Sequence, residues 1–288
     1  MAFEYSYDIA ERHIRVASAV PLTQDERSGL FASVRGGRAQ LEIDFRLGEL
    51  PKPEGECVFT SDFFRMNEKN GDFIIETLDR RGTGPMLCAR FSAGSDTVEL
   101  TARPDTPKEL FTMQQVWQAV NLPQQLLRTG VLTLHSASAD TEKGVLLFCG
   151  ASGAGKSTQA ELWKKFAGAC VQNGDKNAVT PENGRVHGMP ISGTSGICRR
   201  FDRPLRAIVT VEKSAENRAW RLGAAAAMAA LASCVHGVSP RGMEKNIVEL
   251  IAETVGRIPV YRLCCTPDER AVKILKFSLD ERTEDGVY

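Results

Sequence analysis

Hydrophobic and polar residues alternate along several short segments in the first third of the chain. In Leu41–Leu47 every second residue is apolar, and the residues between are charged. Successive side chains of a strand point to opposite faces, so this pattern predicts a strand with one buried face. Similar runs occur at 57–60, 73–78, 86–91 and 97–102, separated by turns that contain Gly or Asp. Residues 1–105 are therefore predicted to form a β-rich N-terminal domain, arranged as an antiparallel meander.

The pattern changes to helical spacing after residue 105. Thr106 is suited to cap a helix, Pro107 to its first position, and Glu109 to a capping box. Apolar residues then recur three or four positions apart, and Gly130 is suited to end the helical region. The sequence thus predicts a domain boundary near this helix, with a second domain over 106–288.

Strands and helices alternate from residue 131 onward, which is typical of an α/β domain whose central strands are partly parallel. The predicted strands are 131–135, 145–149, 205–211 and 259–263, and the predicted helices are 157–167, 223–235, 244–255 and 268–277. Trp117 and Trp163 lie on helical faces and are predicted to belong to the core.

Composition excludes several classes of protein. The 36 basic and 36 acidic residues cancel, so charge favours neither a nucleic acid nor an anionic membrane as partner. The chain starts without a basic and apolar leader and has no run long enough to span a bilayer, so we expect a cytoplasmic protein. The eight cysteines include no C-x-x-C pair, and Cys149, Cys264 and Cys265 are expected to be buried thiols.

A phosphate-binding motif, G-x-x-x-x-G-K-[ST], stands between a predicted strand and a predicted helix. Its residues, with one further hydroxyl, are Gly150, Ala151, Ser152, Gly153, Ala154, Gly155, Lys156, Ser157 and Thr158. Glycines let backbone N–H groups curl around phosphate oxygens, the lysine neutralises the β- and γ-phosphates, and the first hydroxyl binds Mg²⁺. The motif predicts ATP and Mg²⁺ as cofactors; the alternative is a surface turn rich in small residues.

Several segments around this motif resemble the HPr kinase/phosphorylase superfamily, whose phosphate-loop fold is shared with phosphoenolpyruvate carboxykinases. The resemblance covers about 131–280 and is carried by the motif itself and by Leu134-His135-Ser136-Ala137, Asn173-Gly174-Asp175-Lys176, Gly188-Met189-Pro190, Pro204-Leu205-Arg206-Ala207-Ile208 and Pro259-Val260-Tyr261-Arg262-Leu263-Cys264. It implies a mixed-sheet fold around a strand–loop–helix core, and ATP-dependent phosphorylation of serine.

The resemblance also implies roles for individual residues. His135 matches a histidine that precedes the loop strand, and Asp175 matches the second of two adjacent aspartates that bind metal and act as general base. Gly174 stands in place of the first aspartate, and a Glu-x-Arg-Gly signature is absent between 180 and 230. These departures disfavour HPr itself as the substrate. Some members of the wider group resemble kinases that modify serine in precursor peptides.

Further charged residues are candidates on chemical grounds. Arg199 and Arg200 follow a segment rich in Gly, Ser and Thr (192–196), which is suited to closing over a phosphate; the alternative is a solvated pair. Glu212, at the end of a predicted strand, is a candidate for the second carboxylate, and Lys176 for a phosphate contact.

The sequence therefore predicts an enzyme: an ATP- and Mg²⁺-dependent kinase that phosphorylates a hydroxyl, with serine of a protein or peptide as acceptor. Asp175, His135, Arg199 and Arg200 are the predicted catalytic residues, and Ser157 and Asp175 the predicted metal ligands. Two alternatives stay open: an ATP-binding sensor or scaffold that transfers nothing, and a kinase of small molecules. Carboxykinase chemistry is disfavoured because only the phosphate loop of that site is recognised. The oligomeric state stays open.

Overall fold

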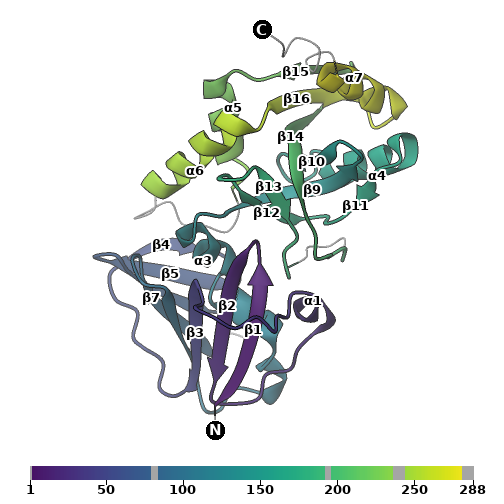
Figure 1. Cartoon of the computed structure of the whole chain (residues 1–288). Helices are drawn as coiled ribbons and strands as arrows, with labels where there is room; N and C mark the ends of the chain where they lie inside the picture. The colour runs from purple at the N-terminus through teal and green to yellow at the C-terminus, as the bar shows by residue number, and fades with distance from the viewer. Residues whose placement is uncertain (1, 79–83, 192–195, 236–243, 281–288) are drawn as a thin grey trace. The chain divides into compact units, whose positions relative to one another are not determined.

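The computed structural model describes residues 2–78, 84–191, 196–235 and 244–280. They form a mixed α/β fold with two eight-stranded sheets, each of which belongs to its own compact unit (Figure 1). The predicted α/β class is confirmed at this level. Each unit is described separately below.

The sheet of the first unit has the strand order β1-β2-β3-β8-β7-β6-β5-β4. Strands β4 to β8 pair antiparallel in sequence order, which confirms the predicted meander for these five strands but not for 41–47. The pairings β2–β3 and β3–β8 are parallel and were not predicted. The bounds are β1 Phe3–Ile9, β2 Arg12–Ser18, β3 Leu41–Leu47, β4 Glu56–Thr60, β5 Phe64–Lys69, β6 Asp72–Thr77, β7 Leu87–Ser92 and β8 Thr97–Ala102.

The helices of this unit are α1 Glu26–Gly29, the 3₁₀ turn η1 Lys108–Leu110, α2 Met113–Ala119 and α3 Leu122–Arg128. The predicted cap at Thr106 is wrong, because α2 begins later. Thr112 is its cap, and the Thr112 hydroxyl accepts a hydrogen bond from the Gln115 N–H. The Thr106 hydroxyl instead donates a hydrogen bond to the Met86 carbonyl. This threonine, although suited to capping a helix, therefore makes a tertiary contact.

The boundary between the units lies at Gly130–Val131, not near residue 105. Helix α2 contacts β6 and β7 of the first sheet. The Trp117 side chain is fully buried, packs edge-on against Tyr7 at 5.0 Å between ring centroids, and donates to the Ser28 hydroxyl. Residues 106–130 therefore complete the core of the N-terminal sheet. The change of pattern after residue 105 marks a change of secondary structure, not the end of a domain.

The second unit begins at Val131 and contains the other sheet, whose order is β10-β9-β12-β13-β14-β16-β15. The eighth strand, β11, pairs with β9 outside this order, and β10 also pairs with β14. Strand β14 runs parallel to both β10 and β16, which confirms the expected parallel centre. Its strands are β9 Leu132–Thr141, β10 Gly144–Cys149, β11 Cys170–Val171, β12 Lys176–Thr180, β13 Arg185–His187, β14 Asp202–Lys213, β15 Arg218–Arg221 and β16 Val260–Cys265. The helices are α4 Lys156–Ala167, α5 Ala224–Ala232, α7 Glu269–Asp280 and α6 Glu244–Arg257, of which residues 248–257 belong to this unit.

Helices α4 and α7 pack on one face of this sheet (Figure 1). Apolar side chains from β9, β10, β14 and β16 form a continuous core with Trp163 of α4 and Leu275 of α7. Trp163 is 2% exposed, as the helical pattern predicted. Because alternate residues of β10 face opposite sides, Leu146 and Phe148 point into this core while Leu147 and Cys149 belong to the other face.

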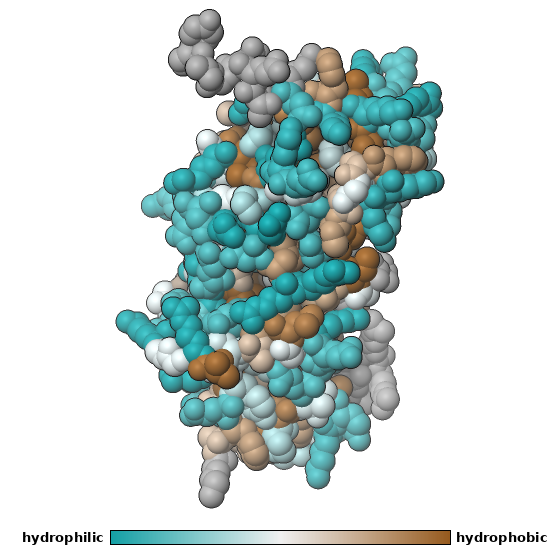
Figure 2. Space-filling model, turned by 45° about the vertical axis from the view of Figure 1, so that its right-hand side comes forward, coloured by the Kyte–Doolittle hydropathy of each residue, from teal (hydrophilic) through white to brown (hydrophobic). Residues whose placement is uncertain are grey.

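Hydrophilic side chains cover most of the face drawn in Figure 2, and the hydrophobic residues there form small, separate patches. Within the described residues, no helix combines the length and the apolar character that crossing a bilayer requires.

Replacing Trp163 by alanine should destabilise the second unit. Loss of a fully buried aromatic side chain leaves a cavity, and the expected cost is about 3–5 kcal/mol in the free energy of unfolding. Trp220 is 42% exposed on the edge strand β15, so Trp220→Ala should cost under about 1 kcal/mol. Denaturant unfolding followed by circular dichroism measures both. Equal costs would contradict the packing described for α4.

Candidate functional site

The phosphate-loop motif lies between β10, all six residues of which are buried, and helix α4. Three of its glycines have backbone angles that favour glycine, with φ of +144° at Gly150, +75° at Gly153 and +107° at Gly155. Gly155 is the N-cap of α4, so the helix begins at Lys156. The strand, loop and helix predicted from the sequence are all present.

The Lys156 side chain is folded back over the loop. Its ammonium donates to the carbonyls of Gly150 and Ala151, both at 3.0 Å, and the residue is only 7% exposed. Ser157 and Thr158 follow in the first turn of the helix and are exposed. The N–H groups of a first helical turn have no partner within the helix and carry the positive end of its dipole, so this corner is suited to an anion.

His135 and Asp175 meet beside the loop. Strands β9 and β12 pair so that His135 lies opposite Lys176, and the Ser136 N–H donates to the Asp175 carbonyl at 2.9 Å. The His135 Nε2 and Asp175 Oδ1 atoms are 3.7 Å apart. Burial, and next the positive charge of Lys156, lower the pKa of His135. The structure therefore brings three residues predicted for the site, Lys156, His135 and Asp175, into one electrostatic cluster.

Lys176 belongs to the same cluster. Its ammonium lies 3.9 Å from the Asp175 carboxylate, and burial lowers the pKa of Lys176. Asn173 was not predicted and positions this turn: it is fully buried, and its side-chain oxygen accepts from the Asp175 N–H at 3.3 Å. What marks Asn173 as a positioning residue is that its amide is buried beside a predicted catalytic turn. The sequence alone does not distinguish such an asparagine from an ordinary turn residue.

The structure does not bring Arg199 to the loop. Its guanidinium contacts the Cys170 sulfur at 3.8 Å, and Cys170 pairs with Asp140 of β9. Ser136 of the same strand pairs with Cys149, the last residue before the loop. Asp140 lies about 13 Å along β9 from Ser136, so the contact of Arg199 is well away from the loop. The prediction that Arg199 closes over phosphate is therefore wrong for this conformation. Arg200 is exposed, and residues 192–195 of the segment before it lie outside the described residues.

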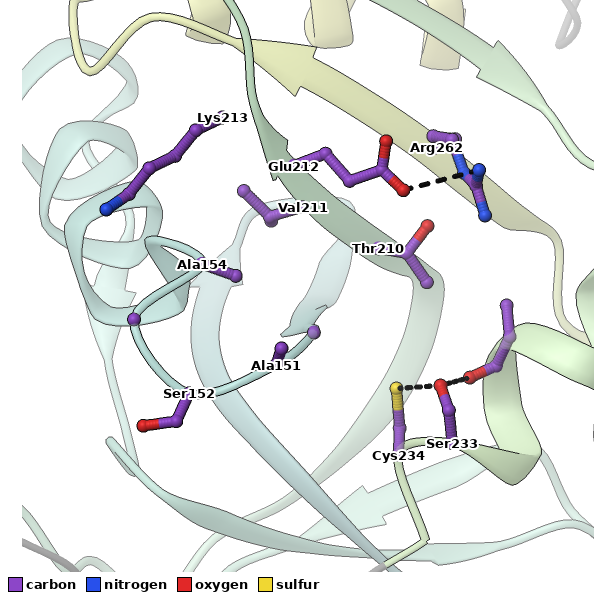
Figure 3. A pocket seen from close by; sticks show the side chains of 13 residues that line it. Ala151, Ser152, Ala154, Thr210, Val211, Glu212, Lys213, Ser233, Cys234 and Arg262 are labelled. Atoms are coloured by element: carbon purple, nitrogen blue, oxygen red, sulfur yellow. Dashed lines mark hydrogen bonds and ion pairs between the residues drawn. The ribbon is translucent and has the colours of Figure 1, made fainter.

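A cavity of about 540 Å³ opens at the loop, beside β14 (Figure 3). It lies at the carboxyl ends of the parallel strands β10 and β14, where ligands bind in open α/β sheets. The lining residues are Gly150, Ala151, Ser152, Gly153 and Ala154 of the loop, Thr210, Val211, Glu212 and Lys213 of β14, Ala230 and Ser233 with Cys234, and Arg262 of β16. Its volume is within the range of small-molecule sites.

Glu212, the candidate for a second carboxylate, lines this cavity but is already paired. Its Oε1 lies 3.3 Å from Arg262 Nη1, and its Oε2 lies 3.6 Å from the Cys264 sulfur. Cys264 is only partly buried, which corrects the expectation for this thiol, whereas Cys149 and Cys265 are buried as expected. Arg262 was not predicted as a site residue. It lies in the middle of an apolar strand, and its place beside the loop follows only from the order of the strands in the sheet.

No protein-family model matches the chain, and no curated protein is significantly similar to it. Arguments about function therefore rest on the loop, the cluster beside it and the cavity.

Replacing Gly150 by alanine should damage this corner more than replacing Gly153. A Cβ at Gly150 would lie 3.0 Å from the Val211 carbonyl oxygen and 3.2 Å from Ala154 Cβ, whereas a Cβ at Gly153 meets nothing within 4 Å. Both positions carry the strain of a positive φ, so Gly150→Ala should lower the free energy of unfolding by about 1–3 kcal/mol more than Gly153→Ala. Urea denaturation of the two variants checks this. Equal losses would show that the loop is not tightly packed against β14.

Proposed function

We propose that this chain is an ATP- and Mg²⁺-dependent kinase of the HPr-kinase-like group, with a carboxykinase-like phosphate-loop fold in its second unit. The observation that carries the proposal is the cluster at the loop: His135 lies within electrostatic reach of the lysine that would hold the phosphates, and the Asp175 carboxylate lies 3.7 Å from His135 Nε2. Phosphoryl transfer needs positioning and charge neutralisation more than covalent chemistry, and this arrangement supplies both.

Each residue has a role in the proposal. Lys156 and the backbone N–H groups of the loop bind the β- and γ-phosphates, and the cavity beside β14 accommodates the nucleoside or the acceptor. Ser157 and Asp175 offer the oxygen donors that Mg²⁺ prefers, so they fit the metal that the resemblance implies. Bound there, Mg²⁺ would neutralise charge on the transferred group. Asp175 is also the general base that accepts the proton of the attacking hydroxyl, and His135 holds its carboxylate in place.

The acceptor in this proposal is a serine hydroxyl of a protein or peptide. Its basis is the resemblance stated above. Neutral overall charge gives no electrostatic reason for a nucleic acid as substrate.

A second candidate function, an ATP-binding sensor without transfer, is favoured by two observations. Gly174 replaces one of the two aspartates of the resembled family, and Arg199 is directed to the far end of β9. A loop with one carboxylate in the cluster beside it, and with the guanidinium of Arg262 already paired to Glu212, is better suited to holding nucleotide than to stabilising the charge that develops in transfer.

Replacing Asp175 by asparagine separates these functions. As an enzyme, the Asp175→Asn variant should keep ATP affinity within about tenfold, because Lys156 and the loop N–H groups remain. Transfer should fall by about 10²–10⁴-fold, the contribution of general acid–base catalysis. The measurement is transfer from γ-labelled ATP to a library of serine, threonine and tyrosine peptides, and separately to free amino acids and sugars. Asp44→Asn, a partly exposed carboxylate of β3 that pairs with Arg46 in the first unit, is the matched control.

Each outcome decides between the candidates. Transfer to a serine peptide that Asp175→Asn abolishes supports the proposal. Transfer only to a free amino acid or sugar moves the assignment to a small-molecule kinase. A wild type that binds ATP tightly and modifies none of these acceptors favours the sensor. Transfer that Asp175→Asn leaves intact contradicts the role of this carboxylate and directs attention to Glu212.

A further inference from the structure

Two cysteines meet where β10 turns into the phosphate loop. Cys149 is the last residue of β10 and pairs with Ser136 of β9. Beyond Ser136, strand β9 continues without β10, and the segment after α5 lies against it there. The His135 N–H donates to the Cys234 carbonyl at 2.8 Å, and Leu134 forms a bridge with Val235. This topology places Cys234 directly beside the end of β10.

The two thiols lie close together at the start of the loop. Cys149 is fully buried and Cys234 is 4% exposed. The neighbouring Cys149 thiol, and next the Ser233 hydroxyl at 3.7 Å and the Gly150 N–H, lower the pKa of Cys234, whereas the neighbouring Cys234 and burial raise the pKa of Cys149. Cys234 lines the cavity beside the loop, so a small oxidant that enters the cavity reaches its sulfur (Figure 3).

We propose that Cys149 and Cys234 are a redox-responsive pair that closes to a disulfide when a hydroperoxide enters the cavity, and that this closure lowers the affinity of the phosphate loop for ATP. The second half of the inference rests on the proposed nucleotide binding of the loop. The first half, formation of the disulfide, does not.

The chemistry requires one equivalent of hydroperoxide. The Cys234 sulfur attacks the outer oxygen of the peroxide, which breaks the O–O bond, yields a sulfenic acid at Cys234 and releases an alcohol, or water if the oxidant is hydrogen peroxide. The Cys149 sulfur then attacks the Cys234 sulfur, the S–O bond breaks, and the thiol proton leaves with the oxygen as water. Two thiols are oxidised by two electrons and the peroxide is reduced by two.

Disulfide formation acts on the loop through Gly150. A covalent S–S bond is much shorter than a hydrogen-bonded contact between two sulfur atoms, so closure pulls the end of β10 and the segment at Cys234 together. Gly150 follows Cys149 directly and has little room to adjust, since any Cβ there would lie 3.0 Å from the Val211 carbonyl oxygen. The Gly150 carbonyl also accepts a hydrogen bond from Lys156. A shift of Gly150 is therefore transmitted to the ammonium that would bind the phosphates.

The experiment compares the reduced, oxidised and re-reduced full-length protein. Hydrogen peroxide is added in steps, free thiols are alkylated, and peptide mass spectrometry maps any disulfide. ATP affinity is measured by calorimetry on the same samples, before oxidation, after it and after dithiothreitol. Cys234→Ser and Cys234→Ala remove the partner that faces the cavity. Cys57→Ser removes an exposed thiol of the first unit and is the matched control.

We expect a disulfide that links Cys149 and Cys234, at least a tenfold rise in the Kd for ATP on oxidation, and full recovery on reduction. Both effects should vanish in the Cys234 variants and persist in Cys57→Ser. Oxidation of exposed thiols without this disulfide overturns the inference. A disulfide that leaves the Kd unchanged overturns its regulatory half. Reduced wild type that does not bind ATP overturns the proposed function together with the regulatory half, while the peptide map still decides whether the two thiols pair.

Discussion

The site depends on the way one buried ammonium is held. Lys156 is the first residue of α4, yet its side chain returns to the Gly150 and Ala151 carbonyls at the other end of the loop. A charged group that is 7% exposed has to be compensated, and backbone carbonyls do this without neutralising it. The loop therefore keeps a net positive charge at its centre. After burial, the same charge is the next cause that lowers the pKa of His135, which lies beside Asp175, and it also contributes to the lowered pKa of Cys234 at the cavity.

Local periodicity predicted the individual elements well. The strict alternation over Leu41–Leu47 is strand β3 with the same bounds, and the helix after the loop begins one residue before its predicted start. Periodicity contains no information about distant partners. The parallel pairing of β3 with β8 and the short strands β12 and β13 arise from tertiary contacts, and the boundary near residue 105 was misplaced because the helices that follow serve the first core.

The candidate site was predicted in part, and for physical reasons. The spacing of glycines, lysine and hydroxyl is local, so the loop is readable in the chain. His135 and Asp175 are far apart in sequence, and their proximity follows from the register of β9 with β12. Arg199 was misassigned because its place depends on a register at the opposite end of β9. Arg262 and Cys234 approach the loop only through the sheet order and the return of the chain after α5, which no local pattern specifies.

The central claim is that the ammonium of Lys156 binds the phosphates of ATP, and isothermal titration of Mg²⁺·ATP into wild type and Lys156→Ala tests it most directly. The account predicts saturable binding to the wild type and a loss of about 2–4 kcal/mol in the variant, the scale for removing a buried, charge-assisted contact. Lys164→Ala, an exposed position in the last turn of the same helix, is the comparison for a general loss of positive charge and should change the affinity much less. Equal affinities in wild type and Lys156→Ala, with both proteins folded, would contradict the account.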